Sequence, residues 1–180
     1  HGLMSAGQAG AQIVTDVQHE NNAAEAKQID ASFTAALNDL QFNPDSGFMA
    51  RQGKGAVDTY LDSIKAIDQV RRDALNSSRN PRVKEMIAPV LAERAMAVST
   101  ALDRHYVAQR QHWQVQSSQD RAEVSLRDAA SNFADPEYFA RSLGTAHQEA
   151  DAQGKLLGWD EATTRLRREQ YTDSAFKLRF

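Results

Sequence analysis

The fold is decided by residues 81–113, which read PRVKEMIAPVLAERAMAVSTALDRHYVAQRQHW. Mostly apolar side chains recur in this stretch at intervals of three or four residues, which is the spacing of the buried seam of a coiled coil. The seam predicts one long helix that packs along its length against other helices. Its members are Val83, Ile87, Leu91, Ala95, Val98, Leu102, Tyr106, Gln109 and Trp113.

Proline signals locate the start of this long helix. Asn80 before Pro81 combines a preferred N-cap residue with the residue that is favoured at the first helical position. Pro89 predicts either a kink near the start of the helix or its true beginning. Both alternatives leave the rest of the seam helical.

The end of the long helix is less sharply marked. A polar segment at 114–120 interrupts the apolar pattern, which returns at Val124, Leu126, Ala130 and Phe133. A continuous helix to about Ala134 would be about 80 Å long at a rise of about 1.5 Å per residue. We therefore expect an elongated, coiled-coil-like helical bundle of about five helices with one very long central helix.

The boundaries of the remaining helices are predicted from proline, glycine and asparagine residues, which are common where helices begin or end. The first is an amphipathic helix whose face comprises Ile13, Val17, Ala24, Ile29, Phe33, Leu37 and Leu40. Because no stop signal precedes Phe180, we expect a longer parent protein. The predicted segments are residues 1–4, which look like a vector scar, a long helix at 5–40, a turn with a second helix and the long helix at 41–134, and a C-terminal helical pair at 135–180.

The composition favours helices and excludes several classes of function. Apolar residues make up 41% of the chain and aromatic residues 7%, and alanine, the commonest residue, loses no side-chain entropy in a helix. The absence of cysteine excludes disulfides, thiolate zinc sites and iron–sulfur clusters. A net charge of −3 gives no reason to expect a nucleic-acid partner. No apolar run approaches the ~20 residues of a membrane span, and the start lacks the pattern of a signal peptide.

The sequence offers no convincing ligand or metal site. Gly53-Lys54-Gly55 lacks the spacing and the preceding strand of a phosphate-binding loop, so we interpret it as a turn before the second helix. His105 and His112 share one helix face, but no two histidines have the i, i+4 spacing of a zinc site. We predict no metal, no cofactor and no small-molecule ligand. Without a G-x-S-x-G elbow or a marked pair of carboxylates, we predict no catalytic residue and no enzyme in this chain.

Four residues are candidates for contact with a protein partner. Tryptophan is enriched at the energetic centres of interfaces, and Trp113 lies where the apolar seam ends, so core packing and an interface are equal alternatives for it. Trp159 is interpreted mainly as packing at the start of the last helix, whose basic stripe is interrupted by acids and is interpreted as a solvated face. Phe48 and Lys54 complete the set, in a turn that we expect to be pinned against a core.

The turn also carries a family resemblance. Phe42-Asn43-Pro44-Asp45-Ser46-Gly47-Phe48, followed by Gly53-Lys54-Gly55-Ala56-Val57-Asp58, resembles a helical segment of virion proteins of tailed phages and prophages. There, a turn of the type N-P-x-x-G-[FY] leads into G-K-x-A-V-[DE]. The order of the later helices is similar too, so that the resemblance covers most of residues 30–180.

The resemblance implies a non-catalytic, tail-associated or injected virion protein that is assembled in the bacterial cytoplasm. Its expected partners are other virion proteins or further copies of itself. Some members of that family carry a cell-wall-cleaving module further along the chain. One alternative is therefore the N-terminal helical part of a phage cell-wall-degrading enzyme whose catalytic module lies beyond residue 180. A weaker alternative is a bacterial coiled-coil adaptor.

Overall fold

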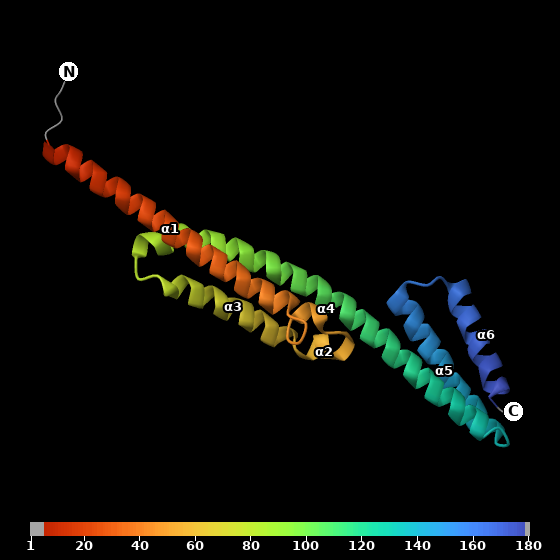
Figure 1. Ribbon diagram of the computed structural model, residues 1–180. Helices are drawn as coiled ribbons and strands as arrows, with labels where there is room; N and C mark the ends of the chain where they lie inside the picture. Colours follow the sequence, from red (N-terminus) through yellow and green to blue (C-terminus); the bar gives the residue numbers. More distant parts are fainter. Residues whose placement is uncertain (1–5, 179–180) are drawn as a thin grey trace. The chain divides into compact units, whose positions relative to one another are not determined.

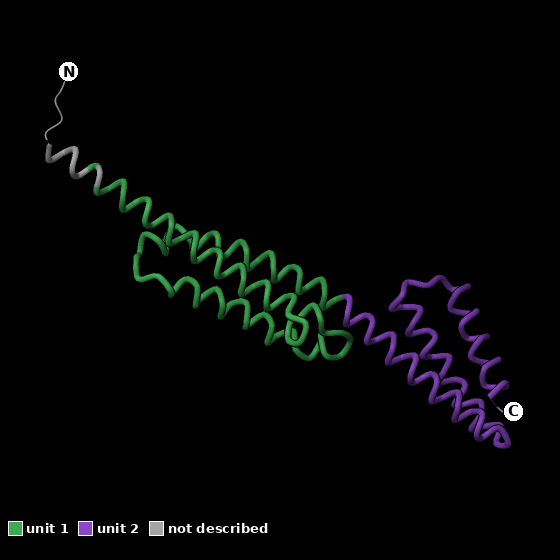
Figure 2. Tube along the Cα trace, in the orientation of Figure 1, with its two compact units in different colours: residues 1–107 green, residues 108–180 purple. Residues whose placement is uncertain are grey.

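The computed structural model describes residues 6–178, and the regular elements in that range are all helical (Figure 1). The predictions of an all-α fold and of one very long helix are confirmed. Two compact units divide inside this long helix, between Val107 and Ala108 (Figure 2). The elements are α1 (Ala6–Phe42), the 3-10 helix η1 (Phe48–Ala50), α2 (Gly53–Asp58), α3 (Tyr60–Ser77), α4 (Pro81–Ser131), α5 (Pro136–Leu157) and α6 (Glu161–Lys177).

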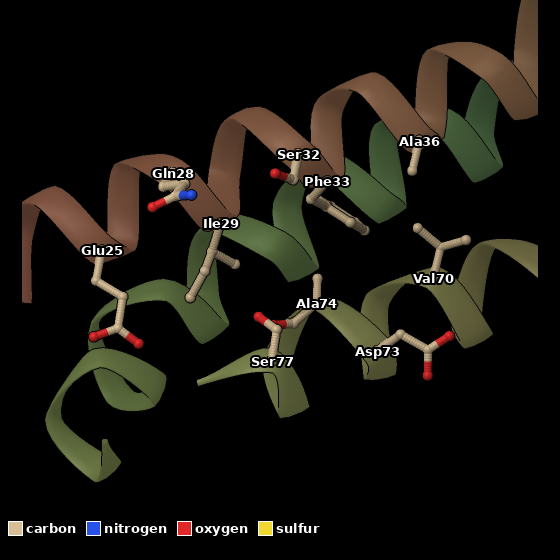
Figure 3. A pocket seen from close by; sticks show the side chains of 10 residues that line it. All are labelled: Glu25, Gln28, Ile29, Ser32, Phe33, Ala36, Val70, Asp73, Ala74 and Ser77. Atoms are coloured by element: carbon tan, nitrogen blue, oxygen red, sulfur yellow. The ribbon is translucent and has the colours of Figure 1, made fainter. Parts of the chain in front are cut away.

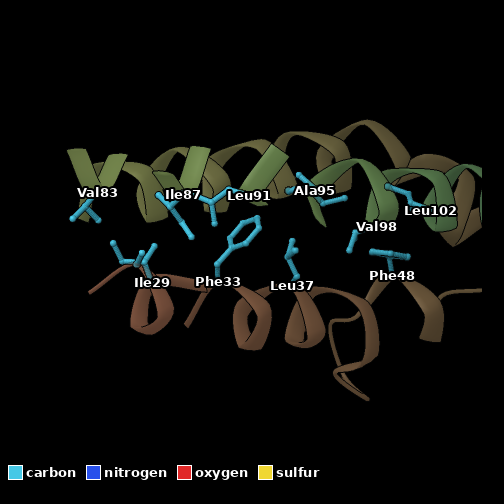
Figure 4. Packing of buried hydrophobic residues seen from close by; sticks show 12 residues of the cluster. Ile29, Phe33, Leu37, Phe48, Val83, Ile87, Leu91, Ala95, Val98 and Leu102 are labelled. Carbon is cyan, nitrogen blue, oxygen red and sulfur yellow. The ribbon is translucent and has the colours of Figure 1, made fainter. Parts of the chain in front are cut away.

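Unit 1 is organised around an apolar core to which α1, η1, α3 and α4 contribute. Figure 4 shows Phe33 of α1 pointing toward Leu91 of α4, and each of these side chains is only 1% exposed. The seam predicted on the long helix is buried here from Val83 to Leu102. Its burial stabilises the fold by about 25 cal/mol for each Å² of apolar surface removed from water. The core residues are Ala26, Ile29, Phe33, Leu37, Phe48, Ile67, Val83, Ile87, Leu91, Ala95, Val98 and Leu102.

The buried face of α1 differs from the predicted face toward the beginning of the helix. Ala26 is buried and Ala24 is exposed, because the face that contains Ile29 continues backward by three residues. Val17 is 48% exposed, and the side chain of Ile13 lies outside the described part of the chain. The predicted apolar stripe is therefore correct only in its second half.

The turn after α1 is ordered, and its geometry explains its residue types. The Asn43 side-chain oxygen accepts hydrogen bonds from the backbone N–H groups of Asp45, at 3.0 Å, and Ser46, at 3.1 Å. Gly47 approaches Asn43 so closely that a Cβ atom there would lie 2.6 Å from the Asn43 carbonyl oxygen. Phe48 then enters the core and is 4% exposed. The prediction that this loop is pinned against a core is confirmed.

The second helix begins earlier than predicted and is broken once. Gly53-Lys54-Gly55 forms the first turn of α2, although we interpreted it as a turn before the helix. Gly53 takes φ +53°, which glycine adopts without strain, and Lys54 pairs with Asp58 one helical turn later. At Thr59 the backbone leaves helical geometry, and its hydroxyl donates to the Gly55 carbonyl at 2.7 Å. The described chain therefore has six α-helices, where about five were expected.

The long helix α4 begins at Pro81 and not at Pro89. The Asn80 side-chain oxygen accepts from the backbone N–H of Arg82 at 3.0 Å, which makes Asn80 the N-cap. Pro89 removes the helical donor for the carbonyl of Glu85. Because both residues are exposed, water can hydrogen-bond to that carbonyl, and the helix tolerates the proline.

Unit 2 consists of α5, α6 and the last part of α4, which stays helical through the polar segment 114–120. Its core is built on small side chains: Ala129, Ala146 and Ala175 are all 0% exposed. Close approach is also required at Gly154, where a Cβ atom would lie 2.7 Å from the Thr164 hydroxyl oxygen. Small residues thus bring the helices of this unit close together.

The apolar face of α4 in unit 2 is another correction. Val124, which we placed on the buried face, is 57% exposed, whereas Ala122 is 1% exposed. The buried face follows residues four apart, from Ser118 through Ala122 to Leu126. The prediction missed it because serine and alanine contribute little to an apolar pattern.

The helix ends of unit 2 follow the sequence signals. Gly158 ends α5 in the left-handed conformation, with φ +67°, whereas Gly154 lies inside α5. Asp160 caps α6 by accepting from the Thr163 N–H at 2.7 Å. Asp135 accepts from two backbone N–H groups at the start of α5, those of Glu137 and Tyr138.

Replacing Asp135 with alanine should lower the stability of unit 2 by about 1 kcal/mol, because the two N–H groups lose their acceptor. Chemical unfolding followed by tryptophan fluorescence measures this effect, since both tryptophans lie in unit 2. Asp135→Asn keeps an acceptor oxygen and should be nearly as stable as the parent. Equal loss in both variants would contradict the capping role.

Candidate functional site

The candidate site is an open groove between α4 and α5 in unit 2, with a volume of about 470 Å³. Trp113, Ser117 and Arg121 form a row on α4 at intervals of one helical turn. The surface of the groove is mainly apolar, although five of its eight lining residues are polar or charged, and its two charged residues, Arg121 and Lys155, are both cationic. The lining residues are Trp113, Gln114, Ser117, Ser118, Arg121, Ala152, Lys155 and Leu156.

A polar cluster lies beside this groove and connects α4 to α5 and α6. Arg121 donates to Glu149 through Nε, at 2.7 Å, and through Nη2, at 2.9 Å. The Ser118 hydroxyl donates to the same carboxylate at 2.7 Å. Gln153, which is 0% exposed, donates to the hydroxyl oxygens of Ser118, at 3.2 Å, and Tyr171, at 3.0 Å. The cluster thereby fixes one wall of the groove.

The carboxylate of Glu149 is held in its charged form. Hydrogen bonding by Arg121 lowers the pKa of Glu149, and the Ser118 hydroxyl lowers it further, against the opposing effect of burial. The same pair raises the pKa of Arg121. Because Arg121 and Ser118 of α4 both donate to it, the charged Glu149 carboxylate holds the polar cluster together.

The lowered pKa of Glu149 predicts a loss of stability in acid. Its contribution is present above the ordinary carboxyl pKa of 4.5 and is lost as the pH falls through the lower folded value. As the pH is lowered from neutral to about 3, the melting temperature of unit 2 should therefore fall more steeply for the parent than for Glu149→Gln. Glu123→Gln, at an exposed carboxylate on α4, is the matched control and should keep the parent slope. Parallel curves for parent and Glu149→Gln would contradict the assignment.

Sequence reasoning missed the polar members of this cluster. Gln153 continues the small-residue spacing of Ala146 and Ala150, so that a polar side chain occupies a seam position. Ser118 is likewise a polar residue at a seam position, one helical turn before Ala122. A search for polar residues at apolar positions would have found both.

The two tryptophans have different surroundings. Trp113 lines the groove and is half-buried. Trp159 packs beside α6, where the Arg167 guanidinium carbon lies 5.6 Å from its ring centre and 5.6 Å from that of Tyr171. This cation–π arrangement agrees with the packing interpretation of Trp159.

The other two predicted interaction residues lie in unit 1. Phe48 is buried in the core and offers no ring surface to a partner. Lys54 is exposed and forms its ion pair with Asp58 on the same helix. The structure therefore leaves Trp113 as the predicted residue that lines an open groove of mainly apolar character.

Unit 1 has an open groove of its own, of about 620 Å³, between α1 and α3. Figure 3 shows Val70 and Ala74 of α3 across from Ile29 and Phe33 of α1, with carboxylates on the rim. The lining residues are Glu25, Gln28, Ile29, Ser32, Phe33, Ala36, Val70, Asp73, Ala74 and Ser77. Small side chains leave the core partly open on this side.

Two of the five histidines form hydrogen bonds that connect separate elements. His105 Nε2 lies 2.8 Å from the Arg51 carbonyl oxygen, so this nitrogen carries a proton and donates. His147 Nε2 lies 2.9 Å from the Thr172 hydroxyl, which already donates to a helix carbonyl, so His147 donates as well. Within residues 6–178, no group of three or more metal-ligating side chains is found.

Comparisons of the chain with protein-family models, with curated proteins and with solved structures give no match. In the part that the structure describes, no helix has both the length and the apolar character needed to cross a membrane.

Proposed function

We propose that this chain is a non-catalytic interaction component of a tailed-phage or prophage particle. The interaction role is carried by residues 14–21 of α1, all of which are exposed. Figure 1 shows this part of α1, in red, continuing past α3 and the start of α4. Most helical stability in proteins comes from packing one face of the helix, and residues 14–21 are exposed in the described chain. A segment of this kind is suited to packing against another protein.

The non-catalytic part of the proposal is supported by polar side chains that form hydrogen bonds between helices. Arg94 pairs with Asp30 through two hydrogen bonds of 2.6 and 2.8 Å that join α4 to α1. The Tyr60 hydroxyl donates to Asp103 at 2.7 Å, and this hydrogen bond raises the pKa of Tyr60. Such contacts connect helices and stabilise the fold.

The phage part of the proposal rests on the sequence pattern of the turn and of α2. Its test is the protein content of particles purified from the phage or prophage whose genes surround this one. The chain should co-purify with capsid or tail proteins at a fixed ratio across a density gradient. Its presence in the cell lysate together with its absence from intact particles would overturn the proposal.

A second experiment separates this function from that of a cell-wall-degrading enzyme. The 180-residue chain should leave a peptidoglycan suspension turbid, while a lysozyme control clears it. Clearing that persists after repurification would contradict the non-catalytic assignment. Reading the gene beyond residue 180 then distinguishes a structural protein from the leading part of an enzyme.

A further inference from the structure

We propose that the α4–α5 groove of unit 2 binds the first part of α1, residues 12–21, of a second copy of this chain. The inference rests on the proposed interaction function and names its partner. It joins two features of the structure: a groove with mainly apolar surface and two cationic residues, and a helical segment of opposite charge that is exposed at residues 14–21.

The segment has the chemistry that the groove requires. Val14 is 58% exposed and Val17 is 48% exposed, and at a spacing of three residues they share one helix face. Glu20 lies three residues beyond Val17 and so flanks this face, with Asp16 one turn before it. No lysine or arginine occurs within residues 12–21. The segment is therefore an acidic helix with a valine edge.

The groove is complementary in both respects. Trp113 and Leu156 supply apolar surface for the valines. Lys155 is exposed, has no ion pair with a carboxylate in the described structure, and is available to Glu20 or Asp16. Arg121 adds positive charge, although Glu149 already binds it. Like charges would not meet, because no carboxylate lines the groove.

The lengths agree as well. The row from Trp113 to Arg121 spans about 12 Å at the helical rise, and residues 12–21 span about 14 Å. Groove and segment are different surfaces of the chain, so each copy offers one of each. The contact is head-to-tail, and such contacts build rings or open chains according to whether the rotation closes.

The test is association of the full chain, measured by light scattering after size exclusion over a range of concentrations. The parent should exceed the mass of one chain at high concentration and approach it on dilution. Glu20→Lys and Lys155→Glu should each weaken association about tenfold, and the double variant should recover most of the loss. Recovery identifies the two residues as partners, because two unrelated losses would add.

Lys65→Glu, an exposed charge reversal on α3 outside both surfaces, is the matched control and should associate like the parent. Circular dichroism should show that all variants keep their helix content, since no substituted side chain is buried. A parent that remains a single chain at every concentration would overturn the inference. So would association that neither charge reversal weakens, which would point to a different contact. Neither result bears on particle content, so the proposed function is tested separately.

Discussion

Replacing Phe33 with alanine should lower the free energy of unfolding of unit 1 by about 3–5 kcal/mol. The ring is 1% exposed and stands in the middle of the core shown in Figure 4. Its removal loses apolar burial and leaves a cavity that the rigid helices on either side cannot fill. A loss of this size is a large part of the stability of a small folded unit.

The distribution of tryptophan makes this loss measurable in one unit. Both tryptophans belong to unit 2, so their fluorescence reports on that unit, whereas far-UV circular dichroism reports on all helices. Phe33→Ala should lower the dichroism midpoint in denaturant and shift the fluorescence midpoint less. Phe42→Ala, at a ring that is 63% exposed, should leave both midpoints close to the parent. Equal effects of the two substitutions would show that the core is not as described.

Replacing Gly47 with alanine should destabilise unit 1 by about 1–3 kcal/mol. The added methyl group would lie 2.6 Å from the Asn43 carbonyl oxygen and 2.7 Å from the Gln41 carbonyl oxygen. Both are backbone atoms of an ordered turn, so relief requires the chain to move. Phe48, the next residue, would be displaced from the core.

Gly55→Ala is the matched control from the same motif, because a Cβ placed there would meet no atom within 4 Å other than its chain neighbours and the backbone of its own helix. It should leave stability unchanged or raise it by up to about 1 kcal/mol, since alanine favours helix over glycine. Thermal unfolding followed by circular dichroism compares the two variants. A Gly47→Ala protein as stable as the Gly55→Ala protein would refute the steric account of the turn.

The fold could be predicted from sequence where large apolar residues recur at regular intervals. The core face of α4 was predicted correctly from residues 83–102, and its start was predicted correctly from Asn80 and Pro81. The prediction failed where small or polar residues do the packing. Alanine and serine are also common at solvent-exposed helix positions, so the sequence of α4 in unit 2 does not show which of them are buried. Ala122 and Ser118 are nevertheless each 1% exposed.

The candidate groove was predictable only through Trp113. Its other determinants come from two helices that are far apart in sequence, and spacing within one helix does not show which residues of another helix will face it. Phe48 illustrates the opposite error, because an aromatic residue in a turn was taken as a possible contact for a partner, whereas it is buried. Burial depends on long-range packing, which local patterns do not contain.

The sequence separations within the two units have a consequence for folding during synthesis. The ion pair between Asp30 and Arg94 joins residues 64 positions apart, whereas the contacts of Glu149 with Ser118 and of His147 with Thr172 span 31 and 25 positions. Local contacts form faster than distant ones. On a ribosome, Phe33 must therefore wait, exposed, until α4 has emerged. Newly made unit 1 is thus the part of the nascent chain whose apolar surface most needs to be covered by chaperones until α4 has been made.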